Sequence, residues 1–274
     1  MNLSKRKVKP FLVAVALFLS LFCGVRGVFA QQNIADSTIL LSMLQVSYGG
    51  YLPQADMGKR FGYTNFIGVE FGPKFKSNIY LTGGGYFIFG DVVHENQLFA
   101  STSYNLVITD PSTGRTDQYA GWLDRDGFDF VPTLNLRGFA ASLRLGYIFK
   151  QFRPPKLNPN SGPFVEIGIQ GIQHSIGISA PDNAPYLAGD YRKGYDRLTR
   201  GVGSLFSVGF RVFSSSRFIN GYVAFDYQHN FTQTLRYNLD ERRYDDRIRN
   251  DILLGFRVGW CFPVYRQAAS DFYY

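Results

Sequence analysis

The stretch 251–265 near the C-terminus, DILLGFRVGWCFPVY, alternates strictly between two kinds of side chain. Read as a strand, it carries on one face Ile252, Leu254, Phe256, Val258, Trp260, Phe262 and Val264, and on the other Leu253, Gly255, Arg257, Gly259, Cys261 and Pro263. Successive side chains of a strand point to opposite faces. One face is therefore apolar and aromatic, and the other is small with a single charge.

The same pattern recurs over 43–51, 67–74, 79–89, 139–149, 164–178, 206–212 and 219–228. Little sequence remains to cover so many apolar faces, so lipid is the simplest cover, and a sheet that spans lipid must close on itself. A barrel of eight strands is only wide enough for its own side chains to fill it. We therefore predict an all-β protein, an eight-stranded antiparallel transmembrane β-barrel with long extracellular loops and a filled lumen, located in the bacterial outer membrane.

The predicted connections differ in length in the way that such barrels require. The connections 52–60, 91–137, 180–201 and 238–250 are long and mostly charged, whereas 76–78 and 214–217 are short turns. Long extracellular loops and short periplasmic turns place both termini in the periplasm. The connection 151–162 is long for a periplasmic turn, which allows it a contact of its own. In 164–178 the alternation changes phase near Gly171, which predicts a β-bulge there.

The N-terminus has the three parts of a secretory signal peptide. Basic residues precede the apolar run PFLVAVALFLSLFCGV, and Val28 and Ala30 are small residues at the positions before a cleavage site. A lipoprotein signal at Cys23 is disfavoured because Phe22 is too bulky for that motif. The expected organisation is a signal peptide over 1–30, a periplasmic lead-in over 31–42, the barrel over 43–265 and a periplasmic tail over 266–274. Cleavage removes five basic residues and no acid, so the formal charge falls from +8 to +3 and no nucleic-acid partner is expected.

The face opposite the apolar one carries both signs of charge, and the inward charged set is Glu70, Lys74, Arg144, Glu166, Arg211, Asp226 and Arg257. Buried charges must be paired, so we interpret these seven residues as a salt-bridged network that fills the lumen. A proton or solute path along the same residues is the alternative. A soluble β-sandwich or lipocalin-like barrel also alternates, but its polar face would be solvated, whereas here that face is mostly small residues with isolated charges.

The loop 188–201 is the most distinctive of the predicted loops, and its polar and aromatic residues are Asp190, Tyr191, Arg192, Lys193, Tyr195, Asp196 and Arg197. Tyrosine provides contact area at a low entropic cost and arginine provides directed hydrogen bonds, so this composition suits a surface for a protein partner. A lid that packs on the barrel mouth fits the same composition equally well.

Signals for enzymatic or metal chemistry are weak. His94, His174 and His229 lie on three separate segments without metal-ligand spacing, and neither a nucleophile elbow nor a phosphate loop is present. The run 124–129, DRDGFD, has some character of a calcium loop but lacks the downstream glutamate, so an ordinary charged turn is the better interpretation. We expect no catalytic residue, metal or cofactor, and we predict that the chain is not an enzyme.

Several stretches resemble small outer-membrane β-barrel proteins of Bacteroidota: 47–53 with 60–62, 76–78, 189–197, 257–260 with Pro263, and the ending 272–274. More distantly, the chain is similar in build to the PorT- and PorG-like barrels that accompany type IX secretion. The resemblance implies a secretion-associated role and supplies no catalytic residue. The tail 266–274 continues beyond the last strand, unlike the common barrel ending, and is either a docking segment or a free end.

These observations together predict a non-enzymatic outer-membrane barrel. It would act as a structural or accessory component of the envelope through its loops and C-terminal tail, in contact with outer-membrane lipid and with protein partners. A narrow, porin-like channel for ions or small solutes is the alternative function.

Overall fold

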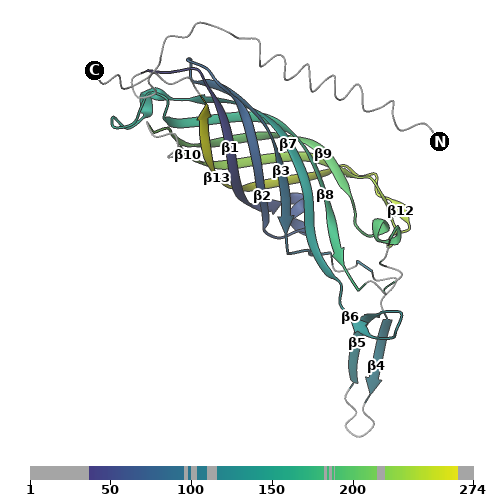
Figure 1. Ribbon diagram of the computed structural model, residues 1–274. Coiled ribbons are helices and arrows are strands. Elements are labelled where there is room, and N and C mark those ends of the chain that lie inside the picture. The colour runs from purple at the N-terminus through teal and green to yellow at the C-terminus, as the bar shows by residue number, and fades with distance from the viewer. Residues whose placement is uncertain are drawn as a thin grey trace, which may run out of the picture. The chain divides into compact units, whose positions relative to one another are not determined.

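The barrel consists of eight long strands. The computed structural model describes residues 37–95, 98–99, 104–109, 116–181, 184, 187, 189–214 and 220–264. The barrel strands are β1 (Leu41–Gln54), β2 (Thr64–Lys74), β3 (Ile79–Gly90), β7 (Thr133–Ile148), β8 (Gly162–Ser179), β9 (Thr199–Val212), β10 (Gly221–Thr234) and β13 (Arg249–Val264). They close in the order β1-β13-β10-β9-β8-β7-β3-β2, with antiparallel pairing throughout (Figure 1). The predicted eight-stranded antiparallel barrel is confirmed.

Closure occurs between the first and last barrel strands. Gln45 of β1 lies opposite Cys261 of β13 on one side and opposite Glu70 of β2 on the other. The predicted signal peptide 1–30, the beginning of the lead-in and the tail 266–274 lie outside the described residues. Leu41 and Ser42, which the sequence assigned to the lead-in, already belong to β1.

Short elements occupy the connections. They are α2 (Ala55–Arg60), β4 (Tyr104–Thr109), β5 (Thr116–Leu123), β6 (Asp129–Phe130), the 3-10 helices η1 (Lys150–Phe152) and η3 (Tyr191–Gly194), β11 (Tyr237–Asn238) and β12 (Arg243–Tyr244). The segment 52–60 was predicted as a loop, but its first three residues extend β1 and the remainder is helix α2. Among the described residues, no helix combines the length and the apolar character needed to cross a membrane.

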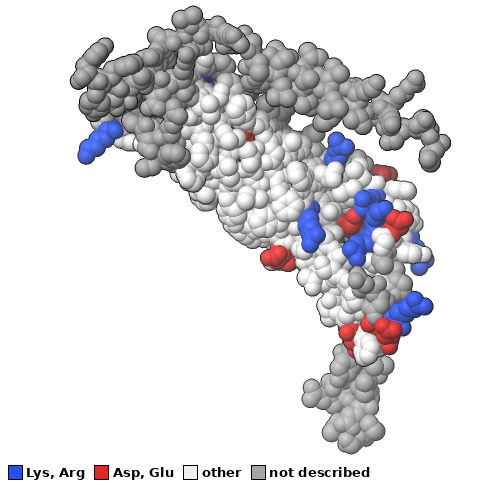
Figure 2. All heavy atoms as spheres, in the orientation of Figure 1, with Lys and Arg blue, Asp and Glu red and all other residues white. Residues whose placement is uncertain are grey.

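An apolar belt surrounds the outside of the barrel. Its members are large, exposed side chains such as Val46, Val69, Leu143, Ile167, Val208, Phe225 and Val258. Figure 2 shows this part of the surface almost free of charged atoms, with most of the visible charged side chains gathered toward one end. Rings stack along single strands, as Trp260 does on Phe262 with centroids 5.0 Å apart. An exposed belt of this kind faces lipid, and the chain is a membrane-spanning barrel of the outer-membrane type.

The extracellular edge of the belt is a line of polar side chains that follows the strand register. Outward positions turn polar at Gln54, Arg137, Gln173, Arg200, Gln233 and Asn250. These residues lie at one level, because Gln173 pairs with Arg200 and Arg200 pairs with Gln233. The strands continue past this line into water, where the outward side chains are no longer apolar. For this reason β7 and β9 begin earlier, and β10 ends later, than the alternation of apolar residues predicted.

The predicted β-bulge at Gly171 is wrong. The pairing of β8 with β7 runs without interruption from Phe164 to Ser179, and the inward face carries Glu166, Gln170, Ile172, His174, Ile176 and Ile178 in one phase. The apolar side chains change faces because the surroundings change. Within the membrane they face lipid, and beyond Gly171 they face the inside of a barrel that now stands in water.

Two apolar clusters therefore close the lumen at its two ends. The upper core, at the extracellular end, comprises Tyr51, Met57, Phe61, Phe66, Tyr86, Ile88, Leu98, Phe99, Leu136, Ala140, Ile172, Ile176, Ile178, Ala184, Leu187, Tyr195 and Leu253. The lower core, at the periplasmic end, comprises Ile39, Leu41, Met43, Tyr80, Ile148, Phe164, Phe213, Tyr222, Ala224 and Cys261. Charged and polar side chains fill the space between them.

Candidate functional site

Arg257 of β13 lies at the centre of the lumen. Its guanidinium contacts three carboxylates: Nε lies 2.8 Å from Asp226, Nη2 lies 2.7 Å from Glu166 and Nη1 lies 3.3 Å from Glu70. Nη1 also donates a hydrogen bond of 2.7 Å to the hydroxyl of Tyr222. The side chain of Arg257 is 1% exposed, so these contacts exist in a medium of low dielectric, where each is strong and an unpaired charge is costly.

Two further arginines complete the charged layer. Arg144 of β7 pairs with Glu70 at 2.9 Å and with Glu166 at 3.6 Å. Arg211 of β9 pairs with Glu166 at 3.5 Å, and its guanidinium lies 4.7–5.1 Å from the centroids of three aromatic rings, those of Tyr80, Phe164 and Tyr222. The ring faces attract the cation, so Arg211 is held by aromatic contacts as well as by its ion pair.

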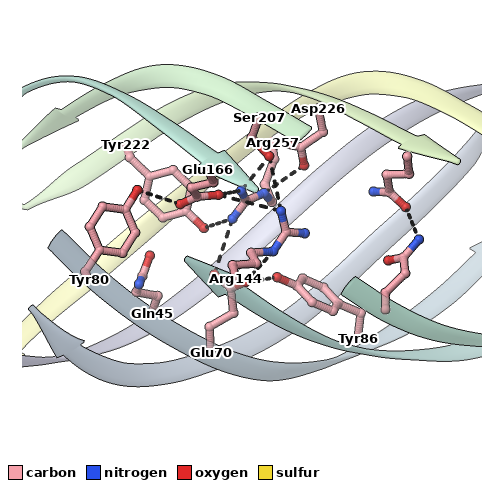
Figure 3. A network of polar contacts seen from close by, with 12 residues as sticks. Gln45, Glu70, Tyr80, Tyr86, Arg144, Glu166, Ser207, Tyr222, Asp226 and Arg257 are labelled. Atoms are coloured by element: carbon pink, nitrogen blue, oxygen red, sulfur yellow. Dashed lines mark hydrogen bonds and ion pairs between the residues drawn. The ribbon is translucent and has the colours of Figure 1, made fainter. Parts of the chain in front are cut away.

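Tyrosines supply further hydrogen bonds to the three acids, and Figure 3 shows those of Tyr80 and Tyr86. The hydroxyl of Tyr51 donates to Asp226 at 2.7 Å, that of Tyr80 donates to Glu166 at 2.8 Å, and that of Tyr86 donates to Glu70. Alternation along their strands puts these tyrosines on the inward faces, but the predicted charge network did not include them. Alternation identifies the face of a residue, whereas its partner across the lumen depends on the register of distant strands.

We define the lumen network as Glu70, Arg144, Glu166, Arg211, Asp226 and Arg257 with their tyrosine partners. The six charged residues come from β2, β7, β8, β9, β10 and β13, and Gln45 of β1 and Tyr80 and Tyr86 of β3 contact them. Every barrel strand therefore contributes to one layer of contacts. A layer with three cations and three anions, each buried and paired, fills the lumen without net charge.

Lys74 is the predicted member of the charge network that lies elsewhere. It is the last residue of β2, and its ammonium donates to Asn160 Oδ1 at 2.8 Å while forming no ion pair with any described residue. Asn160 also accepts from the backbone N–H of Ile39 at 3.1 Å and donates to the carbonyl of Ser37 at 2.9 Å. The long connection 151–162 thus folds against the periplasmic end of the barrel, and this is the contact that its length allowed.

A second polar layer lies between the lumen network and the upper core. Gln170 Nε2 donates to Gln228 at 2.9 Å and to Asn230 at 2.7 Å. Above them, His174 Nε2 lies 3.2 Å from Asp251, which also accepts a hydrogen bond from Thr232. These residues pair with one another across the lumen, so the polar interior continues from the lumen network to the upper core.

The second half of the loop 188–201 packs onto the barrel mouth. Tyr195 is 5% exposed and belongs to the upper core, where its ring lies 4.9 Å from that of Phe99. Asp196 pairs with Arg236, and its carbonyl accepts a hydrogen bond from the backbone of Ile176. Partial burial raises the pKa of the Asp196 carboxyl, and the charge of Arg236 opposes that shift. Arg197 pairs with Glu95 at 2.9 Å, so these three residues form a lid.

The first half of the same loop remains exposed. Asp190, Arg192 and Lys193 are exposed, and Tyr191 is 66% exposed. Asp190, Tyr191 and Lys193 line a surface groove of about 470 Å³ together with Arg236, Tyr237 and Leu239. One half of the loop therefore covers the barrel mouth, and the other half forms one wall of an open groove.

The described residues contain no group of three or more His, Cys, Asp or Glu side chains able to hold a metal ion. In the run 124–129, Asp124 Oδ1 accepts the backbone N–H groups of Asp126 at 2.9 Å and Phe128 at 2.8 Å. The carboxylate therefore stabilises a turn, with Gly127 in the left-handed region at φ +85°.

Comparison with known proteins finds likeness in fold only. No family model matches the chain, and no curated protein matches it. Among solved structures, the attachment invasion locus protein Ail of Yersinia pestis aligns at 7% identity over 81% of this chain and 99% of its own, with a TM-score of 0.32. The outer membrane protein OprG of Pseudomonas aeruginosa aligns at 10% identity over 82% and 98%, with a TM-score of 0.33. These scores are low, and the fold described above rests on the strand pairing of the chain itself.

Proposed function

We propose that the protein is a non-conducting, non-enzymatic barrel that serves as a structural or accessory platform of the outer membrane. The observation that carries this proposal is the filled lumen, in which side chains from all eight strands form the lumen network between two apolar cores. Arg144, Arg211 and Arg257 are at most 2% exposed, so the charged layer offers little space for a hydrated ion. Function then resides on the surfaces that the barrel presents at its two ends.

The groove beside Tyr191 is the surface on which we place a protein partner. Tyr191 and Tyr237 are exposed rings at 66% and 38%, and the charges of Lys193, Asp190 and Arg236 surround them. Large aromatic side chains bordered by charged groups are typical of the centre and rim of a protein interface. The tail 266–274 is a second proposed contact, on the periplasmic side. A role beside the secretion machinery is the finer form of this proposal, and it rests on the resemblance in sequence.

Conductance separates the platform from a channel. We expect purified protein in a planar bilayer to give no steady single-channel steps, because both apolar cores and the lumen network would have to move for an ion to pass. An open trimeric porin, reconstituted in the same way, serves as the positive control. Steady and reproducible current steps from the pure protein would contradict the platform and support a narrow channel.

Partner capture tests the proposed groove. Tagged protein extracted from its native membrane in mild detergent should retain a defined partner, and Tyr191→Ala should lose most of it, because a central exposed tyrosine often contributes more than 2 kcal/mol to an interface. Phe128→Ala is the matched control, since Phe128 is an exposed ring, 71% accessible, that lies outside the groove. Deletion of 266–274 tests the periplasmic contact separately. Equal retention by Tyr191→Ala and Phe128→Ala would remove the groove from the proposal.

A further inference from the structure

A second pocket opens at the extracellular end of the barrel, and its polar groups are not balanced. It has a volume of about 280 Å³ and is built from α2, the region of Glu95, Arg197, the segment 241–248 and the beginning of β13. Five of its lining residues are basic and three are acidic. It shares no lining residue with the groove beside Tyr191.

The acids of this pocket are already occupied by partners. Glu95 uses one oxygen for Arg60 at 2.7 Å and the other for Arg197 at 2.9 Å. Asp56 accepts from Lys59 and from the backbone of Asn250, at 2.9 and 3.0 Å. Glu241 pairs with Arg243 at 2.8 Å. No further lining residue is acidic, so the carboxylates of the pocket are committed to cations that the chain itself supplies.

The cations, by contrast, keep donors to spare. Arg60 Nη2, Arg197 Nε and Arg249 Nη1 are buried and make no hydrogen bond to any described residue. The side chains of these arginines are 9%, 10% and 12% exposed, and all three arginines line the pocket. Leaving a buried charged donor unsatisfied is costly, so three guanidinium groups with spare donors at one pocket favour the entry of an acceptor, toward which these side chains would turn.

The electrostatics of Arg60 agree with this geometry. Burial, followed by the positive charge of Arg249, lowers the pKa of the Arg60 guanidinium. Asp245 pairs with both Arg247 and Arg249. Hydrogen bonds from Arg247 lower the pKa of Asp245 to about 2, so this carboxylate is ionised. An anion in the pocket would add negative charge beside Arg60 and Arg249 and reduce the repulsion that remains between them after their pairing with Glu95 and Asp245.

We propose that this pocket is an anion-binding site that takes a phosphate monoester group between the guanidinium groups of Arg60, Arg197 and Arg249. A phosphate monoester carries close to two negative charges and three strong acceptor oxygens for the guanidinium groups that line the pocket. Guanidinium groups match phosphate geometry and form short, charge-assisted hydrogen bonds with it. Lys59, whose side chain is 76% exposed, stands at the rim of the pocket and adds long-range attraction. The volume leaves room for part of the organic group that bears the phosphate.

Calorimetric titration of the full barrel in a non-ionic detergent tests the site, with inorganic phosphate as the probe and chloride at equal ionic strength as the blank. We expect saturable binding of phosphate, weakened at least about tenfold by Arg249→Gln, because one charge-assisted hydrogen bond is lost. Lys59→Gln should weaken binding by a smaller factor. Lys193→Gln is its matched control, because Lys193 pairs with an acid three residues before it, as Lys59 does, but lines the other groove. It should leave phosphate binding unchanged.

Two further arms identify the source of the phosphate group. A soluble sugar phosphate and lipid A in mixed micelles are each titrated in competition with inorganic phosphate. Displacement of inorganic phosphate by the sugar phosphate indicates a soluble source of the phosphate group, and displacement by lipid A indicates a lipid source. Absence of saturable phosphate binding by the wild-type protein would overturn the proposal, and so would an equal loss in Lys59→Gln and Lys193→Gln. If Arg249→Gln does not fold, the comparison of these two lysine variants decides. The site is independent of the proposed platform function, which the conductance and capture experiments test separately.

Discussion

Replacing Arg257 with glutamine is expected to lower the free energy of unfolding by about 3–5 kcal/mol, the usual cost of removing one partner from a buried ion pair. The guanidinium of Arg257 contacts Glu70, Glu166 and Asp226, and all four side chains are at most 2% exposed. A neutral amide in its place leaves three carboxylates with too few cations. Urea unfolding in lipid vesicles, followed by the fluorescence of Trp122 and Trp260, measures the change.

Arg137→Gln is the control for this substitution. This substitution makes the same chemical change on the outward face of β7, where Arg137 is exposed at the polar edge of the belt. The free energy of unfolding should therefore change by no more than about 0.5 kcal/mol. Glu166→Gln introduced into the Arg257→Gln protein removes one of the uncompensated charges and should restore part of the stability. Wild-type stability in Arg257→Gln, or a gain of conductance without loss of stability, would favour a path through the lumen over a structural network.

Replacing Ile167 with arginine is expected to cost about 2–4 kcal/mol, the value for a cation near the midplane on the lipid-facing side of a barrel. Ile167 is 57% exposed and lies in the apolar belt on β8, between Glu166 and Gly168, which face inward. The substitution leaves the lumen untouched and changes only the contact with lipid. The same vesicle unfolding experiment measures it, and membrane-free detergent should reduce the effect.

Ser175→Arg is the matched control, because Ser175 lies on the same strand and the same outward face, two positions beyond Gln173 at the polar edge of the belt. It should change stability by no more than about 1 kcal/mol. Similar costs for the two arginines would mean that the membrane extends over both positions. The proposed boundary at the level of Gln173, Arg200 and Gln233 would then be wrong.

The architecture was predictable because alternation is a local property. The face of each residue within the membrane follows from the sequence, and six of the seven predicted lumen charges come together. Lys74 does not join them, because alternation gives the face of a residue and not its depth, and Lys74 lies at the periplasmic end of β2. The tyrosine partners of the acids were missed for a related reason: which hydroxyl meets which carboxylate depends on the register of strands far apart in sequence.

Alternation misled where the surroundings of the barrel change. The shift at Gly171 suggested an inserted residue, but β8 keeps its pairing and only the solvent outside it changes from lipid to water. Alternation shows which face of a strand is apolar. In the membrane the apolar face lies outside the barrel, and in the part of the barrel that stands in water it lies inside. The proposed phosphate pocket was not predictable from the sequence either, because Arg60 of α2, Arg197 and Arg249 of β13 are far apart in the chain and meet only in the folded protein.

The contribution of all eight strands to the lumen network has a consequence for biogenesis. Arg257 of β13 reaches Glu70 of β2 across the intervening strand β1, so this ion pair spans the seam at which the sheet closes. An open sheet in the bilayer would hold both charges without each other, and such charges are expensive in lipid. In the open sheet Arg257 can still pair with Asp226 and Glu70 with Arg144, so sealing the seam completes the lumen network with this ion pair, which favours the closed barrel over a half-assembled one.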